Sequence, residues 1–150
     1  MSERRELPRN RSIPDSTVIP VLEYADVRAA AKWLCEAFGF RERLRIGDHR
    51  VQLMFGSGAV VVAEAGGAVT HGLGGGHSVM VRVMSADRHC ERARRAGAEI
   101  TREPESHPFG ERQYSAVDPG GHAWTFTETI ADSDPASWGG ELLSDESPTS

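Results

Sequence analysis

The sequence lacks three features that would assign it quickly to a class of protein: paired cysteines, a long apolar run and an excess of basic residues. Its two cysteines, Cys35 and Cys90, both lie in helix-like patterns, which favours free, buried thiols over a disulfide. No apolar run approaches the roughly 18 residues of a membrane span. The 22 Asp and Glu outnumber the 17 Lys and Arg, for a net charge of −5. This balance argues against the basic face that nucleic-acid binding requires.

The N-terminus lacks a secretory signal as well, because no apolar segment follows the charges of residues 1–6. Together these absences predict a cytoplasmic protein with neither a membrane nor a nucleic-acid partner. At 150 residues the chain is long enough for one domain with a sizeable core.

Changes in composition place that domain at residues 16–130. Residues 1–15 are polar and contain two prolines, which predicts a disordered lead-in. Residues 131–150 form an acidic tail rich in Ser and Pro. Within it Trp138 is expected to dock locally, because a large aromatic side chain rarely stays fully solvated.

Within the domain, one order of elements occurs twice. A strand, a helix ending at glycine and three further strands are expected over residues 16–65 and again over 77–130, joined by a glycine-rich linker at 66–76. The sequence therefore predicts an α+β fold of two tandem βαβββ units. Its strands are expected over 17–24, 40–45, 51–55, 59–63, 78–83, 99–102, 113–117 and 123–128, and its helices over 26–38 and 87–96.

The most specific motif is DPGGHAWTF at residues 118–126. Asp-Pro-Gly-Gly is typical of a tight turn, and the aromatic and β-branched run after it predicts a strand. This motif resembles the C-terminal signature of the vicinal oxygen chelate superfamily, which contains glyoxalase I, extradiol dioxygenases and the bleomycin resistance proteins. The resemblance implies an open, cupped mixed sheet with helices outside and a ligand cleft inside.

Further segments resemble a bacterial, bleomycin resistance-like branch of this superfamily. They are TVIPVL at 17–22, WLCEAFGF at 33–40, ARRAGAEI at 93–100 and YSAVDP at 114–119. The resemblance covers residues 17–129 and implies a homodimer, since members commonly complete each cleft at an interface between two chains.

The positions of the metal ligands argue against the usual chemistry of the superfamily. In metal-dependent members four ligands face the cleft, from the first and last strands of each unit. Counting along the strands places these positions at Ile19, Val62, Ser78 and Thr125. Two aliphatic side chains and two hydroxyls suit no divalent ion, so we expect no metal and no other cofactor.

A shifted metal site remains an alternative. His77 precedes Ser78, and a β-bulge would be needed to turn it into the cleft. Glu64 lies two residues beyond Val62, on the same expected face and nearer the rim. A metal-dependent lyase or dioxygenase would use these two side chains.

Without a metal, the expected cleft is a small-molecule pocket. Strand alternation predicts that its lining combines apolar groups with a few polar ones. Among these, Arg82 is expected either to pair with Glu23 or Glu64 or to bind an anion. The full set expected to line the ligand site is Glu23, Arg50, Gln52, Met54, Glu64, Ser78, Met80, Arg82, Gln113, Ser115 and Thr125.

The sequence thus favours a metal-free protein that binds a small organic molecule, an antibiotic or a metabolite, over an enzyme. Two alternatives stay open: the metal-dependent lyase or dioxygenase, and an accessory protein whose cleft is filled by its own side chains or by a partner.

Overall fold

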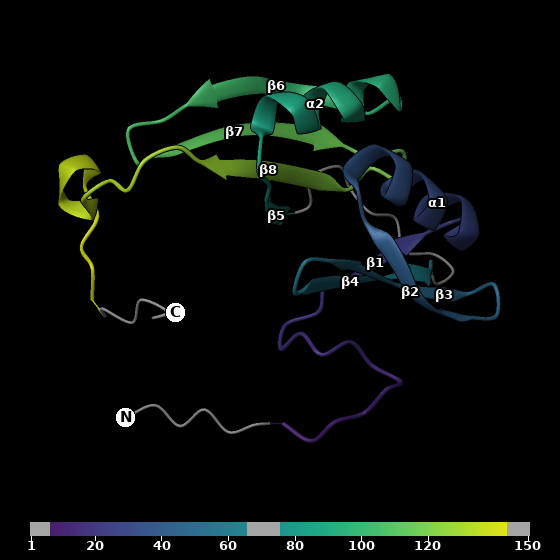
Figure 1. Cartoon of the computed structure of the whole chain (residues 1–150). Coiled ribbons are helices and arrows are strands. Elements are labelled where there is room, and N and C mark those ends of the chain that lie inside the picture. Colours follow the sequence, from purple (N-terminus) through teal and green to yellow (C-terminus); the bar gives the residue numbers. More distant parts are fainter. Residues whose placement is uncertain (1–6, 66–75, 144–150) are drawn as a thin grey trace.

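The computed structural model describes residues 7–65 and 76–143. Its first unit forms a four-stranded sheet in the order β1-β4-β3-β2, in which β1 is parallel to β4 and the other pairs are antiparallel. Helix α1 packs on one face of this sheet (Figure 1). The elements are β1 (Val21–Tyr24), α1 (Val27–Phe38), β2 (Arg41–Ile46), β3 (Arg50–Phe55) and β4 (Gly58–Glu64).

The second unit repeats this plan with a sheet in the order β5-β8-β7-β6, in which β5 is parallel to β8. The predicted α+β fold of two tandem βαβββ units is therefore confirmed, while the predicted linker at 66–76 falls almost entirely outside the described residues. The elements are β5 (Val79–Arg82), α2 (Ala86–Arg95), β6 (Glu99–Ser106), β7 (Glu111–Val117), β8 (Ala123–Thr129) and the short 3₁₀ helix η1 (Pro135–Trp138).

Two strands differ in length from the prediction. β1 starts at Val21 instead of residue 17, and Pro20, which has no N–H to donate, contributes only its carbonyl to the N–H of Val61 at 2.9 Å. β6 runs on to Ser106 instead of ending at Arg102, because register shifts on both sides of Arg102 let the strand continue along β7.

The two units share one hydrophobic core. Strand alternation turns Leu22, Val51 and Val62 of the first unit into it, and Tyr114 and Trp124 of the second. Phe38 at the end of α1 makes the link directly, with its ring centroid 5.2 Å from that of Trp124. The units therefore pack against each other through these shared core residues.

Hydrogen bonds also cross between the units. The indole Nε1 of Trp33 in α1 donates to the carbonyl of Ala96 beyond α2, at 2.9 Å. In the other direction, Arg92 of α2 donates from Nε to the carbonyl of Glu36 at 3.0 Å, near the end of α1. Because the last carbonyls of a helix have no partners within it, Arg92 acts as a C-terminal cap supplied by the other unit.

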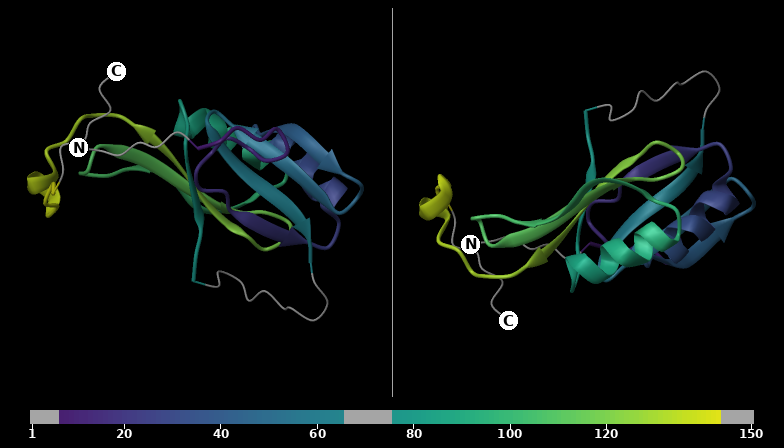
Figure 2. Two further views of the ribbon diagram at one scale, coloured as in Figure 1. Left: turned by 90° about the horizontal axis from the view of Figure 1, so that it is seen from below. Right: turned by 90° about the horizontal axis from the view of Figure 1, so that it is seen from above.

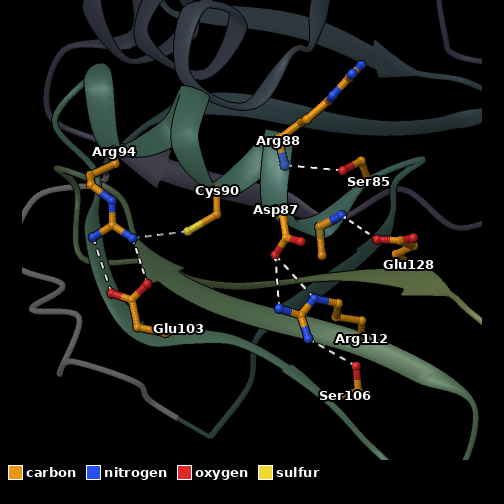
Figure 3. A network of polar contacts seen from close by, with 10 residues as sticks. Ser85, Asp87, Arg88, Cys90, Arg94, Glu103, Ser106, Arg112 and Glu128 are labelled. Carbon is orange, nitrogen blue, oxygen red and sulfur yellow. Dashed lines mark hydrogen bonds and ion pairs between the residues drawn. The ribbon is translucent and has the colours of Figure 1, made fainter.

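Helix α2 is fixed to its own sheet at its N-terminus (Figure 3). The Ser85 side chain caps the helix, and the carboxylate of Glu128 on β8 accepts a hydrogen bond from the N–H of Ala86 at 2.8 Å. Asp87 forms an ion pair with Arg112 of β7 at 3.1 Å. These acceptors meet the unpaired N–H groups and the positive end of the helix dipole, so the Glu128 carboxylate lies against the start of α2.

The two cysteines are free, as predicted. Burial raises the pKa of both thiols, so Cys35 and Cys90 are poor nucleophiles. Beside Cys90, Arg94 forms an ion pair with Glu103 of β6 at 2.6 Å (Figure 3). Both partners are exposed, so this pair contributes little to stability.

The Asp-Pro-Gly-Gly turn is organised by a buried carboxylate. Asp118 is only 3% exposed and accepts hydrogen bonds at 2.6 Å from the hydroxyl of Tyr24 and at 3.0 Å from Nε1 of Trp124. Its other oxygen accepts from the main-chain N–H groups of Gly120 and His122, each at 3.0 Å. This arrangement compensates for the desolvation of the charge and ties β1 of the first unit to β8 of the second.

The same turn approaches β1 so closely that its glycine is required. A Cβ on Gly120 would lie 2.5 Å from the ring of Tyr24, which is closer than two carbon atoms can approach. His122 adds a further link, with Nε2 2.8 Å from the carbonyl oxygen of Glu23 and its ring centroid 4.7 Å from that of Tyr24.

The described start of the tail lies against the far end of the second sheet. Trp138 packs against Phe109 with ring centroids 5.4 Å apart, as predicted for this side chain. Ile130 donates to the carbonyl of Gly110 at 2.8 Å, and Figure 2 shows η1 at the end of the molecule farthest from the first unit. None of the described helices combines the length and the hydropathy of a membrane span.

We predict that Asp118→Asn lowers the free energy of unfolding by about 1.5–3 kcal/mol, because an amide cannot accept all four hydrogen bonds and turns a donor toward other donors. Urea denaturation followed by fluorescence would measure the loss. Asp134→Asn is the matched control, since Asp134 is exposed and accepts one main-chain bond, from Ala136 at 3.1 Å. Equal losses in both variants would contradict the role given to Asp118.

A second prediction concerns His89, which lies between Tyr114 and the carbonyl of Phe38, with Nδ1 2.5 Å from the Tyr114 hydroxyl and Nε2 2.8 Å from the carbonyl oxygen. Burial, aided by the nearby charge of Arg92, lowers the pKa of His89 below its ordinary value of 6.5. The folded state thus binds fewer protons than the unfolded chain, and stability falls as the pH drops through the unfolded pKa.

The stability lost between about pH 7.5 and about pH 5.5 should therefore be smaller in His89→Gln than in the wild type. Urea denaturation at both pH values would measure it. His49→Gln, at an exposed position, serves as the control and should keep the wild-type dependence. An unchanged pH dependence in His89→Gln would show that the imidazole of His89 does not titrate between the two states.

Candidate functional site

Each sheet has an inner face, defined here as the face turned away from the shared core. On the first sheet, Val51 and Leu53 of β3 are fully buried in the core. Alternation therefore places Arg50, Gln52 and Met54 on the inner face, as predicted. Glu23 of β1 is on this face too, because Leu22 and Tyr24 on either side of it point into the core.

The prediction for β4 was wrong by one residue. The register pairs Leu22 with Val62 and Tyr24 with Glu64, so Val62 lies in the core and Glu64 is on the same side at the strand end. The count along the strands had matched Gly58, at the start of β4, with Gly121, just before β8, and this misplaced β4 by one position. A shift of one position turns every side chain of a strand to the other face. Val61 and Ala63 occupy the inner face instead, and Glu64 does not line it.

The inner face of the second sheet carries the residues predicted for it. Trp124 and Phe126 are fully buried in the core, which leaves Thr125 between them on the opposite face. Ser78 lies just before β5 in an exposed position. The strand register places the other predicted residues alongside Thr125 on this face: Met80, Arg82, Gln113 and Ser115.

Polar side chains form a ladder across this face that the sequence did not reveal in full. The Ser115 and Thr125 hydroxyls lie 3.1 Å apart. Further along, the carboxylate of Glu111 accepts hydrogen bonds from Thr127 at 2.6 Å and from Thr129 at 2.7 Å. Glu111 and Thr127 were missed, although both share the alternation of the predicted residues.

Arg82 is placed differently from the expectation. Its strand, β5, lies at the edge of the second sheet, and its side chain is exposed and donates to the Thr129 hydroxyl at 3.0 Å. Within the part of the chain that the structure describes, neither Glu23 nor Glu64 forms an ion pair with it. Solvent therefore reaches the guanidinium, and this charge is available to a ligand.

Part of the predicted lead-in covers the inner face of the first sheet. Gln52 is 5% exposed, and its Nε2 donates to the main-chain carbonyl of Ser12 at 2.9 Å. Arg43 of β2 donates to the carbonyl of Arg11 at 2.9 Å and to Oε1 of Gln52 at 2.6 Å. Pro14 is buried. Residues 10–16, named here the N-terminal strap, thus differ from the disordered segment expected for 1–15.

Arg43 was missed because β2 contains a register shift. The pairing passes from Glu42 to Leu44, so Arg43 is the extra residue of a bulge, and such residues do not follow strand alternation.

An apolar cavity lies where the two units meet. It has a volume of about 500 Å³ and is bounded by β5 and by the hairpin between β3 and β4. The rings of Phe40 and Phe55 and the side chain of Val60 line one part, while Met80 and Arg82 line another. Of the predicted residues, only Met80 and Arg82 line this cavity.

The side chains at the positions expected for the superfamily's metal ligands are not those that divalent ions prefer. With the corrected register these positions are Ile19, Val61, Ser78 and Thr125, which offer two hydroxyls and no imidazole, thiolate or carboxylate. Over residues 7–65 and 76–143, no three His, Cys, Asp or Glu side chains come together in a way that would hold a metal. Metal chemistry has no support in this donor set.

The alternative metal site was expected around His77 and Glu64. His77 is exposed, immediately before β5, and Glu64 lies on the core side of β4. Among the described residues, neither side chain belongs to a group of three or more His, Cys, Asp or Glu that could hold a metal ion.

The model of the Glyoxalase/Bleomycin resistance protein/Dioxygenase superfamily matches residues 19–126. The chain belongs to this superfamily. Among solved structures it is similar to TioX from Micromonospora sp. ML1, at 38% identity over 77% of this chain and 99% of TioX, with a TM-score of 0.65. The bleomycin resistance-like branch is suggested by this similarity.

Two other similar structures share the superfamily fold at lower identity. A glyoxalase-related enzyme from Fulvimarina pelagi is 21% identical over 75% of this chain and 87% of its own, with a TM-score of 0.63. A family member from Burkholderia phytofirmans PsJN is 17% identical over 75% of this chain and 97% of its own, with a TM-score of 0.64. No curated protein sequence matches the chain.

The corrected register of β4 gives a third prediction. Val62→Thr should lower the free energy of unfolding by about 1–3 kcal/mol, because it places a hydroxyl without a partner in the core. Val61→Thr should cost less, because Val61 lies opposite Gln52 on the inner face, where polar partners are present. Urea denaturation of both variants would measure the difference. A larger loss in Val61→Thr would contradict the corrected register and support the facing of β4 that was predicted from the sequence.

Proposed function

We propose that this superfamily member binds a small organic molecule, such as an antibiotic or a metabolite, without a metal ion or another cofactor. The observation that carries the proposal is the chemistry at Ile19, Val61, Ser78 and Thr125, since none of the four positions offers a ligand that a divalent ion prefers. The activity that depends on those ligands elsewhere in the superfamily then has no basis here.

The site itself supports ligand binding. A volume of about 500 Å³ falls within the range of roughly 300–1,000 Å³ found for small-molecule sites. Aromatic and aliphatic side chains bury the apolar part of a ligand, while Arg82 supplies one accessible charge. We propose that a ligand extends beyond this cavity over the second sheet, where Gln113, Ser115 and Thr125 of the polar ladder contact its polar part.

We also propose that the protein forms a homodimer. Val21 and Met80 on the inner faces are 50% and 61% exposed, and apolar side chains exposed in this way favour a partner surface. Dimers are common in the superfamily, and a second copy would enclose inner-face residues that a single chain leaves open. The two free cysteines favour a reducing compartment such as the cytoplasm.

The alternative of a filled cleft also has a specific observation behind it, because the N-terminal strap covers Gln52 on the first sheet. In that case the protein would act through a partner instead of a small molecule.

Native mass spectrometry of protein purified without chelator tests the proposal. We expect a dimer that carries no stoichiometric metal and that retains or takes up a small organic molecule. Adding Zn, Ni or Mn should leave the melting temperature unchanged, because the described residues 7–65 and 76–143 form no group of donors that would bind these ions in the folded state.

His77→Ala and His49→Ala form a matched pair for this experiment, since both histidines are exposed. About one metal ion per chain that is lost in His77→Ala and kept in His49→Ala would refute the metal-free proposal in favour of the lyase or dioxygenase. An inner face that stays fully covered and binds no small molecule would favour the accessory protein.

A further inference from the structure

The N-terminal strap is bound to the first sheet mainly through its main chain. The two side chains that hold it, Arg43 and Gln52, donate to the carbonyls of consecutive residues, Arg11 and Ser12, each at 2.9 Å. In Figure 1 the strap lies on the side of the sheet opposite α1. Since main-chain carbonyls occur in every peptide, these bonds recognise a peptide backbone and not a particular side chain.

The strap presents these carbonyls from a tight turn. Ile13 donates to the carbonyl of Asn10 at 3.3 Å, and the Asn10 side chain accepts from the N–H of Ser12 at 3.0 Å. Such side-chain bonds are typical of asparagine at the start of a turn. Arg11 and Ser12 are thus the two central residues, and their carbonyl oxygens point toward the sheet.

The donors of the sheet are joined in one chain of hydrogen bonds. Nη1 of Arg43 donates to Oε1 of Gln52 at 2.6 Å, which fixes the amide so that its NH₂ group points to the strap. No carboxylate among the described residues contacts Arg43, so its guanidinium relies on neutral oxygen acceptors. A half-buried guanidinium with such partners requires carbonyl oxygens from whatever covers it.

Beside the residues that make these bonds, the strap contains one buried apolar ring. Pro14 is buried, whereas Ile13 next to it is 49% exposed. Val61 and Ala63, on the inner face of β4, are 5% and 7% exposed although they lie outside the shared core. The covered surface therefore consists of two donors next to a small apolar patch.

We infer that this surface is a binding subsite for peptide-like molecules that present two consecutive carbonyl oxygens from a turn beside a compact apolar ring, and that the strap occupies it as an internal mimic. The inference rests on the proposed function and narrows its ligand class. An incoming ligand displaces the strap and takes over its bonds to Arg43 and Gln52.

The short connection between the strap and β1 sets the strength of this competition. A segment tethered by a short flexible connection has an effective concentration in the millimolar range. A free molecule with the same contacts must exceed that concentration to compete, whereas a rigid, cyclic molecule loses less conformational entropy on binding and competes better.

The test uses the full chain and a fluorescently labelled, end-blocked peptide of residues 9–16. Pro14→Asp should release the strap, since it places a charge where the ring is buried, and Ile13→Asp is the matched control at an exposed position. We expect the peptide to bind Pro14→Asp at least roughly tenfold more tightly than it binds Ile13→Asp or the wild type. Adding Gln52→Ala to Pro14→Asp should weaken binding roughly tenfold.

A second peptide tests whether the carbonyls are what is recognised. Thioamides in place of the Arg11 and Ser12 carbonyls keep the planar backbone but accept hydrogen bonds more weakly, so this peptide should bind Pro14→Asp less tightly. A folded Pro14→Asp variant that binds neither peptide, or binds both equally, would overturn the inference. Failure here leaves the proposed function intact if native mass spectrometry still finds a bound small molecule and no metal.

Trypsin provides a measurement that does not depend on the folding of Pro14→Asp. Cleavage after Arg11 in the wild type should be slower than cleavage after Arg9, because only the Arg11 carbonyl is held by the sheet. Gln52→Ala should raise the relative rate after Arg11 by roughly tenfold. Equal rates at the two sites in the wild type would show that the strap is not bound and would also overturn the inference.

Discussion

The arrangement of both units depends on the buried carboxylate of Asp118. A charge removed from water is tolerated only where donors converge on it, and here the donors come from β1, from the turn and from β8. The hydrogen bonds from these donors to Asp118 hold the turn against Tyr24 and determine where β8 begins. The position of Thr125 on the inner face follows from that start, so a buried residue of the core determines which side chains of β8 face outward.

Local patterns in the sequence were sufficient to predict the order of the elements and most of the residues on the inner face of the second sheet. In β8 the large apolar residues Trp124 and Phe126 alternate with threonines, and this contrast identifies the core side without further information. In β4 the sequence reads Ala-Val-Val-Val-Ala, which gives no contrast, so the facing of Val61 and Val62 is decided only by pairing with β1. Arg43 and the strap depend on a bulge and on long-range contacts that leave no periodic signal.

The proposed function keeps the fold of the superfamily without its metal chemistry. The positions that hold a metal elsewhere in the superfamily carry side chains suited to contact organic molecules, and the surrounding residues offer hydroxyls, an accessible guanidinium and an apolar cavity. The two inner faces also differ from each other. The first is covered and recognises backbone carbonyls, while the second is open and displays a ladder of hydroxyls around Glu111. Function in such a fold has to be argued from these surfaces.

The bonds that cross between the two helices occupy matching places in the two units. Trp33 of α1 donates to the carbonyl of Ala96 just beyond α2, and Arg92 of α2 donates to the carbonyl of Glu36 near the end of α1. The two helices begin 59 residues apart, at the N-caps Asp26 and Ser85, and Trp33 and Arg92 are separated by the same number. An indole and a guanidinium thus perform one task from equivalent positions, and each helix depends on the other unit to satisfy carbonyls at its C-terminal end.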